Sequence, residues 1–329
     1  MRDAKVEELV RRFEERDRLA LARLITLVEN RDAQATSIME RLYDRGGHAL
    51  VAGFTGPPGA GKSTLINALL SAYRAMGRTV AVLAVDPSSP FSGGAVLGDR
   101  VRMADHFRDA GVYIRSLSSR GSHGGLSRAA REIVRLLDAF GHDVILIETV
   151  GVGQTELSIM NLADTTVVVT VPEGGDGIQA MKAGLNEIAD IFVVNKADRP
   201  GADRLKAELE LSVSMRSRDG WQPPVLMTRA LQGDGVEALI EALAAHRSFL
   251  AGSRDPARER MRREHEFFEV LGAELEERAE RNLRGGSAGG LLEAVRSGTL
   301  NPYRAARSAV ADREVFAHLV ADTPTSRAD

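Results

Sequence analysis

The segment Gly56–Ser63 limits the possible folds of this chain more than any other part of the sequence. It reads G-P-P-G-A-G-K-S, fits the pattern G-x-x-x-x-G-K-[ST], and stands between an apolar run and a helix-forming stretch. Glycines let backbone N–H groups turn inward around a phosphate, because side chains would block its close approach. The order of strand, loop and helix therefore predicts a nucleotide-binding α/β domain. The predicted ligands of the nucleotide are Gly56, Pro57, Pro58, Gly59, Ala60, Gly61, Lys62, Ser63 and Thr64.

Two side chains at the end of this loop carry its expected chemistry. Lys62 is expected to reach the β- and γ-phosphates and to act in catalysis, and the Ser63 hydroxyl is expected to coordinate Mg²⁺. The N-terminus of the helix that follows adds a partial positive charge. A glycine-rich turn that ends in Lys-Ser by chance would not require a strand before it and a helix after it.

Seven short apolar runs predict a mostly parallel central sheet with helices on both of its faces. Each run is rich in β-branched residues, and helix-forming stretches separate the runs. Periodicity alone would also allow buried helices, but the short length of the runs favours strands. The runs cover residues 50–56, 79–86, 111–117, 143–149, 165–171, 190–196 and 224–230.

The apolar pattern is helical outside this region. Residues 1–45 are predicted to form an N-terminal helical extension, 46–250 the nucleotide-binding domain, and 251–329 a C-terminal helical arm. Residues 255–284 carry apolar side chains among many Arg and Glu. From sequence alone, this stretch is either a solvated helix or an arm that pairs with a second copy of the chain.

Composition excludes several classes of site and partner. The 329 residues include no cysteine, which excludes disulfides, thiolate nucleophiles and sulfur-ligated metals. A formal net charge of −3 with scattered basic residues gives no reason to expect nucleic acid or a membrane surface as partner. The charged N-terminus and the lack of a long apolar run lead us to expect a cytoplasmic protein without membrane spans.

Asn195, Lys196 and Asp198 form the pattern N-K-x-D at the end of an apolar run. A carboxylate such as that of Asp198 accepts hydrogen bonds from both N1–H and N2–H₂ of guanine, a pair that adenine does not offer. A buried group left unmatched costs enough for about 100-fold discrimination. Asn195 is expected to tie the motif to neighbouring segments, and Lys196 to lie along the loop or over the base. The expected cofactors are therefore GTP or GDP together with Mg²⁺.

The next apolar run ends in Thr228-Arg229-Ala230. It occupies the place of the S-A-K-like loop whose backbone amide contacts guanine O6, although its match to that pattern is loose. These three residues are included among the predicted nucleotide-binding residues.

Glu148-Thr149-Val150-Gly151 ends another apolar run, where GTPases commonly carry D-x-x-G. Glu148 is expected to contact the Mg²⁺ sphere and Gly151 to sense the γ-phosphate, and both are predicted to act in catalysis. Val152 occupies the place of the Gln that orients the attacking water in Ras-type proteins. We therefore expect slow intrinsic hydrolysis until a partner completes the site.

Asp86 and Asp99 are further candidates for the Mg²⁺ or water shell. They border a segment rich in Ser, Gly and Pro, residues 87–98, that is expected to act as a switch beside the phosphates. Each carboxylate has an alternative structural role as the cap of a turn.

Six stretches together resemble the MeaB/ArgK family, the GTPase chaperones of adenosylcobalamin-dependent methylmalonyl-CoA mutase. The resemblance covers about residues 45–245 and implies a P-loop GTPase fold of the SIMIBI type. The stretches are GPPGAGKSTLINAL, VDPSSPFSGGAVLGDRVRM, RSLSSRGSHGGLS, ETVGVGQTE, PEGGDGIQAMKAG and NKAD.

The resemblance also implies a role and partners. Such a protein would couple GTP hydrolysis to adenosylcobalamin loading and would protect the mutase from inactivation. It would form a homodimer through its C-terminal arm, and its client would be methylmalonyl-CoA mutase or a sister enzyme for isobutyryl-CoA or ethylmalonyl-CoA. Asp176, Gln179 and Lys182 match the family's third switch. From its residues alone, that loop is a flexible acidic connector.

Other functions remain as alternatives. The family has also carried a label as a transport-associated ATPase or kinase, but N-K-A-D disfavours ATP. Related GTPases deliver nickel, but no cysteine is present and no two histidines lie three or four residues apart. A signal-recognition or translation GTPase would be expected to carry a basic arm for RNA.

Overall fold

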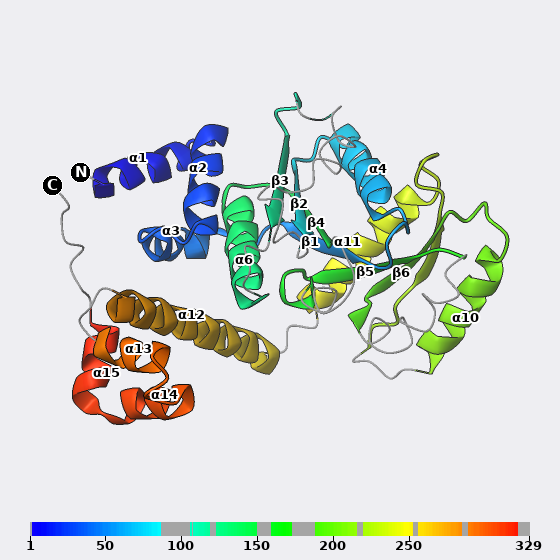
Figure 1. Cartoon of the computed structure of the whole chain (residues 1–329). Helices are drawn as coiled ribbons and strands as arrows, with labels where there is room; N and C mark the ends of the chain where they lie inside the picture. The colour runs from blue at the N-terminus through cyan, green and yellow to red at the C-terminus, as the bar shows by residue number, and fades with distance from the viewer. Residues whose placement is uncertain are drawn as a thin grey trace. The chain divides into compact units, whose positions relative to one another are not determined.

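The computed structural model divides the chain into two compact units, Met1–Ser253 and Arg254–Asp329 (Figure 1). The structure describes residues 2–86, 106, 108–118, 123–149, 159–172, 188–215, 220–252, 256–284 and 289–321.

The first unit is built on a seven-stranded sheet in the order β3-β2-β4-β1-β5-β6-β7. Every pair of neighbouring strands is parallel, which confirms the predicted α/β class and the parallel sheet. Each strand coincides with one of the seven predicted runs. The strands are β1 Leu50–Thr55, β2 Val80–Asp86, β3 Val112–Ser118, β4 Val144–Thr149, β5 Thr165–Thr170, β6 Ile191–Asn195 and β7 Val225–Thr228.

The central strands are apolar at nearly every position because both faces of the sheet are covered. All residues of β1, β4 and β5 are buried. Neighbouring residues of one strand belong to different clusters, since Val51 packs with one apolar core and Ala52 with the other. The prediction of helices on both faces is confirmed.

The helices of the first unit divide between these cores. Side chains of α4 (Lys62–Ala75) and α11 (Val236–Gly252) join one core, and side chains of α6 (His123–Ala139) join the other. A third, smaller cluster packs α10 (Ala202–Ser214) and the short 3₁₀ helix η3 (Ile159–Asn161) against β5 and β6.

The N-terminal helices pack in the same apolar core as α6. They are α1 (Arg2–Glu14), α2 (Arg18–Glu29), α3 (Ala35–Leu42) and the 3₁₀ turn η1 (Tyr43–Arg45). Phe13 of α1 meets Phe140 edge-on with ring centroids 5.2 Å apart. Residues 2–45 therefore pack on the sheet domain within one compact unit.

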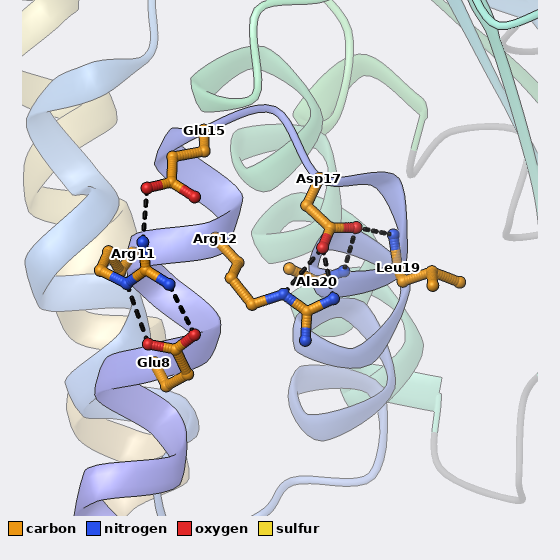
Figure 2. A network of polar contacts seen from close by, with 7 residues as sticks. All are labelled: Glu8, Arg11, Arg12, Glu15, Asp17, Leu19 and Ala20. Atoms are coloured by element: carbon orange, nitrogen blue, oxygen red, sulfur yellow. Dashed lines mark hydrogen bonds and ion pairs between the residues drawn. The ribbon is translucent and has the colours of Figure 1, made fainter.

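The turn from α1 to α2 is fixed by charged side chains (Figure 2). Arg11 of α1 forms ion pairs with Glu8 and with Glu15, which directly follows the helix, and Arg12 forms an ion pair with Asp17. Asp17 also accepts from the first backbone N–H groups of α2, as an N-cap does. The hydrogen bond from Arg12 lowers the pKa of Asp17.

Asp138, in the last turn of α6, fixes the chain just before β1. Its carboxylate accepts from the backbone N–H groups of Gly47, His48 and Ala49, the last at 2.8 Å. This contact sets where β1 begins and therefore where the loop after β1 lies.

The second unit consists of α12 (Pro256–Arg284), α13 (Gly289–Arg296), α14 (Pro302–Ala311) and α15 (Arg313–Val320). Buried Asn282 of α12 donates through Nδ2 to the carbonyls of His318, Leu319 and Ala321 at 2.9–3.0 Å. These bonds cap the C-terminus of α15, where carbonyl groups lack partners within the helix. Across the parts of the chain that the structure describes, no helix combines the length and apolarity needed to span a membrane.

Candidate functional site

The predicted site residues lie where the carboxyl ends of the parallel strands meet. The loop Gly56–Ser63 follows β1, Glu148 lies near the end of β4, Asn195 ends β6 and Thr228 ends β7. In a parallel sheet these ends share one edge, and the crevice there is the usual ligand site of α/β folds.

Two glycines allow the loop after β1 to take its shape. Gly56 has φ of 136° and Gly61 has φ of 88°, values that side-chain-bearing residues rarely adopt. A Cβ at Gly56 would overlap the carbonyl oxygen of Val169, and one at Gly61 would overlap Nδ2 of Asn195. Both positions therefore require glycine because of conformation and because of space.

Lys62 is buried inside the loop and only 7% exposed. Its Nζ donates to the carbonyl of Gly56 at 2.7 Å and to that of Pro57 at 3.2 Å. The ammonium group is therefore held at the centre of the loop, where phosphate oxygens are better acceptors for it. Thr64 is half-buried and lies in the first turn of α4, like Lys62.

Ser63 and Glu148 meet across the site. The Ser63 hydroxyl donates to Oε1 of Glu148 at 2.6 Å, and both residues are buried. A hydroxyl and a carboxylate are the hard oxygen ligands that Mg²⁺ prefers, so this donor set fits the metal. Asp86 ends β2, two residues beyond Ala84, which pairs with Glu148. The strand register thus brings Asp86 to the same edge of the sheet.

Asn195 joins three segments of the site. Its Nδ2 donates to the carbonyl of Ala60 at 2.8 Å. Its Oδ1 accepts from Oγ1 of Thr228 at 3.0 Å and from the backbone N–H of Ala230 at 3.2 Å. Because the side chain is 2% exposed, all three bonds are shielded from water. The phosphate loop, the N-K-A-D motif and the loop after β7 are therefore held in one arrangement.

The rest of the N-K-A-D motif lies along the phosphate loop. Lys196 has φ of 54° and its Nζ donates to the carbonyl of Gly59 at 2.8 Å. Asp198 is exposed, so its carboxylate is accessible to a ligand. The backbone N–H of Ala197 donates to the carbonyl of Thr228 at 3.1 Å, which places this motif beside the loop after β7.

The first backbone N–H groups of the loop after β7 donate to acceptors of this chain. The N–H of Arg229 donates to the carbonyl of Asp234 at 3.0 Å, and that of Ala230 donates to Asn195. An ion pair also joins the side chains of Arg229 and Asp234. Sequence reasoning did not include Asp234, although the Gly-Asp-Gly stretch around it is a turn signal.

Several predicted site residues cannot be placed. They fall outside the described ranges, and their roles remain predictions. They are Asp99, Gly151, Asp176, Gln179 and Lys182.

Comparison with known proteins agrees with the geometry of the site. Residues 21–284 match the model of a family described as methylmalonyl Co-A mutase-associated GTPase MeaB. A putative GTPase of Pyrococcus abyssi is 46% identical over 306 residues, which cover 92% of this chain and 94% of that protein.

Two further relatives extend the comparison. The mouse methylmalonic aciduria type A homolog, mitochondrial, is 36% identical over 74% of this chain and 63% of that protein. The crystal structure of an LAO/AO transport system kinase superimposes with a TM-score of 0.66 at 31% identity, over 94% of this chain and 97% of that one.

Proposed function

This chain belongs to the MeaB family of methylmalonyl-CoA mutase-associated GTPases, and on that premise we infer that its GTPase cycle gates adenosylcobalamin loading into methylmalonyl-CoA mutase. We propose further that the cycle protects the mutase from inactivation. The family description and the name of the mouse relative support this client. The cytoplasmic location expected from the sequence stays a prediction.

The observation that carries the guanine-nucleotide part of the inference is the contact of Asn195 with both the phosphate loop and the loop after β7. Through this side chain, the segment with the exposed Asp198 carboxylate is held at a fixed place relative to Lys62 and Gly61. Recognition of guanine and contact with the phosphates are therefore coupled in one rigid arrangement, as a nucleotide-dependent timer requires.

We propose that Ser63 and Glu148 hold Mg²⁺, with Asp86 and Asp99 in its outer shell. When bound, Mg²⁺ would neutralise charge that develops on the β- and γ-phosphates. The Ser63 hydroxyl would offer its oxygen to the metal, while its hydrogen can remain on Oε1 of Glu148, to which it donates at 2.6 Å. The Lys62 ammonium, which donates to loop carbonyls, would donate to phosphate oxygens instead.

Slow hydrolysis by the isolated chain is part of the proposal. Val152 carries no group that orients water, and Gly151 is proposed to sense the γ-phosphate. Asp176, Gln179 and Lys182 are proposed to pass the nucleotide state to the client. Binding of the client would therefore complete the site and raise the rate of GTP hydrolysis.

Complex formation with a methylmalonyl-CoA mutase tests the client directly. On size-exclusion chromatography, we expect the chain to coelute with the mutase and the amount of complex to differ between GDP and a non-hydrolysable GTP analogue. Asp198→Asn supplies a matched control, because an amide N–H donates to O2 of xanthine where guanine has an amino group. In that variant xanthine nucleotides should replace guanine nucleotides. Absence of a complex in every nucleotide state would reject this client.

We also propose that the second unit makes the chain a homodimer. The face of α12 carries large exposed apolar side chains, with Met261 69% and Phe268 65% exposed. Met261, Phe268 and Leu275 are spaced by seven residues, the repeat of paired helices. A second copy of the same arm would cover them.

Replacing Phe268 with Glu should convert the dimer to a monomer. The substitution places a charge where the proposed interface needs an apolar side chain, and burial of that charge is costly. Multi-angle light scattering measures the mass directly. Leu211→Glu, at an exposed position of α10 in the other unit, is the matched control and should leave the dimer intact. A monomeric unsubstituted chain, or a dimer that survives Phe268→Glu, contradicts the proposal.

A further inference from the structure

A fully buried hydroxyl stands at the last position of β1, directly before the phosphate loop. Thr55 is 0% exposed, and among the residues that the structure describes its Oγ1 has no hydrogen-bond partner. Such a group bears the cost of desolvation without a compensating hydrogen bond. Because buried polar groups without partners are rare, a hydroxyl at this position indicates a partner in another state of the site.

The Thr55 side chain lies on the face of the sheet opposite α4. Successive side chains of a strand point to opposite faces, and Phe54 packs in the core that contains α4. Gly53 is therefore on the same face as Thr55, and a Cβ at Gly53 would overlap the side chain of Ile159. The 3₁₀ helix η3 thus packs directly on β1 two residues before Thr55, on the side that Thr55 faces.

Thr149, the last residue of β4, is the neighbour of Thr55 on that face. Phe54 pairs with Glu148 in parallel register, so the next residues of the two strands, Thr55 and Thr149, lie side by side. Thr149 is 3% exposed, and its hydroxyl donates to the carbonyl of Phe54 at 3.3 Å. An O–H···O bond is usually about 2.7–2.8 Å long, so this bond is weak. Since neighbouring strands are about 4.8 Å apart, a change of rotamer can bring the Thr149 hydroxyl to Oγ1 of Thr55.

The choice of partner for the Thr149 hydroxyl affects the end of β4, which belongs to the nucleotide site. Glu148 directly precedes Thr149 and accepts from the Ser63 hydroxyl at 2.6 Å. Gly151, the proposed sensor of the γ-phosphate, follows Thr149 by two residues. A misplacement of about 1 Å can lower the rate of a reaction by about 100-fold. A hydrogen bond that fixes the end of β4 can therefore control hydrolysis without touching the nucleotide.

We propose that Thr55 is a positioning residue for GTP hydrolysis. When GTP is bound, the Thr149 hydroxyl donates to Oγ1 of Thr55 instead of to the carbonyl of Phe54, and this bond holds the end of β4 in the arrangement for hydrolysis. In the nucleotide-free chain the Thr55 hydroxyl stays unpaired and lowers the stability of the fold. The proposal rests on hydrolysis of GTP at this site and does not depend on the identity of the client.

Thr55→Val keeps the shape of the side chain and removes the hydroxyl, whereas Thr55→Ser keeps the hydroxyl. Without nucleotide, Thr55→Val should unfold at a higher denaturant concentration than the unsubstituted chain, because an unpaired buried hydroxyl is removed. Single-turnover hydrolysis of GTP by the full chain should nevertheless slow by about 10-fold, while the affinity for GDP changes less than about two-fold. Thr55→Ser should retain the rate within about three-fold. A Thr55→Val variant that hydrolyses GTP at the unsubstituted rate, or that loses stability and rate together, would overturn the proposal.

A double-mutant cycle tests whether the two hydroxyls act together. Thr149→Val should slow hydrolysis by a factor similar to that of Thr55→Val, and the double variant should be no slower than Thr149→Val alone, because one hydrogen bond is lost in each case. Thr166→Val, which removes another buried hydroxyl near the start of β5, is the matched control and should leave the rate unchanged. If the two single effects multiply in the double variant, the hydroxyls act independently and the proposal is rejected.

A crystal structure of the full chain with Mg²⁺ and a non-hydrolysable GTP analogue tests the bond itself. We expect Oγ1 of Thr149 to lie within about 3 Å of Oγ1 of Thr55. A Thr149 hydroxyl that still donates to the carbonyl of Phe54 in that complex would contradict the assignment. The mutase takes part in none of these measurements, so their failure leaves the proposed client intact, and failure of the mutase to bind leaves the role of Thr55 intact.

Discussion

Replacing Asn195 with alanine should weaken GDP binding by about 100-fold and lower the free energy of unfolding by about 2–4 kcal/mol. The substitution removes three buried hydrogen bonds and leaves the carbonyl of Ala60 and the N–H of Ala230 without that partner. Buried polar groups left unsatisfied carry the full cost of desolvation. The phosphate loop and the loop after β7 also lose the side chain that holds them together.

Denaturant unfolding and calorimetric titration with GDP measure the two effects in the same preparation. Thr228→Val is the matched control, because it removes only the bond from Oγ1 to Asn195. Thr228→Val should lower the free energy of unfolding by about 1 kcal/mol and weaken GDP binding only a few-fold. If Asn195→Ala lowers the free energy of unfolding no more than Thr228→Val does, the three bonds do not act together.

Replacing Glu148 with Gln should lower the rate of GTP hydrolysis by about 100-fold or more. Glutamine keeps the size of the side chain and a carbonyl oxygen for the Ser63 hydroxyl, so the buried contact of 2.6 Å can persist. The negative charge that favours a divalent cation is lost. We therefore expect the dependence of nucleotide binding on Mg²⁺ to weaken as well.

The affinity for GTP analogues, measured with Mg²⁺ and with EDTA, separates the metal contribution from protein stability. In the unsubstituted chain, removal of Mg²⁺ should weaken binding clearly, whereas Glu148→Gln should bind about equally in both conditions. Glu148→Asp keeps the charge on a shorter side chain and should retain part of the Mg²⁺ response. A full Mg²⁺ response in Glu148→Gln would show that other residues hold the metal.

The sheet was predictable from sequence because its strands are buried on both faces. Such strands are apolar at nearly every position, so their runs stand out from the helices between them. The N-terminal helices show the opposite case. Their periodicity predicted helices but did not reveal that Phe13 packs on Phe140, which directly follows α6 far along the chain. Helical spacing identifies an apolar face and does not identify what covers it.

The site was predictable to the extent that its motifs are local. Glycine positions and the order of strand and loop identified Lys62 and Ser63 without any distant contact. The bond between Ser63 and Glu148 joins residues 85 positions apart, and that between Asn195 and Ala60 joins residues 135 positions apart. Spacing in the sequence does not encode such contacts. For the same reason, the pairing of Arg229 with Asp234 emerged only from the structure.

The proposed role in the mutase system is tested by the rate of GTP hydrolysis, measured with and without a methylmalonyl-CoA mutase. We expect slow turnover by the chain alone and stimulation of about 10-fold or more when the mutase is added. The Asp198→Asn variant should show the same stimulation with XTP. An unchanged rate with the mutases for methylmalonyl-CoA, isobutyryl-CoA and ethylmalonyl-CoA would contradict the chaperone role and leave the GTPase itself intact.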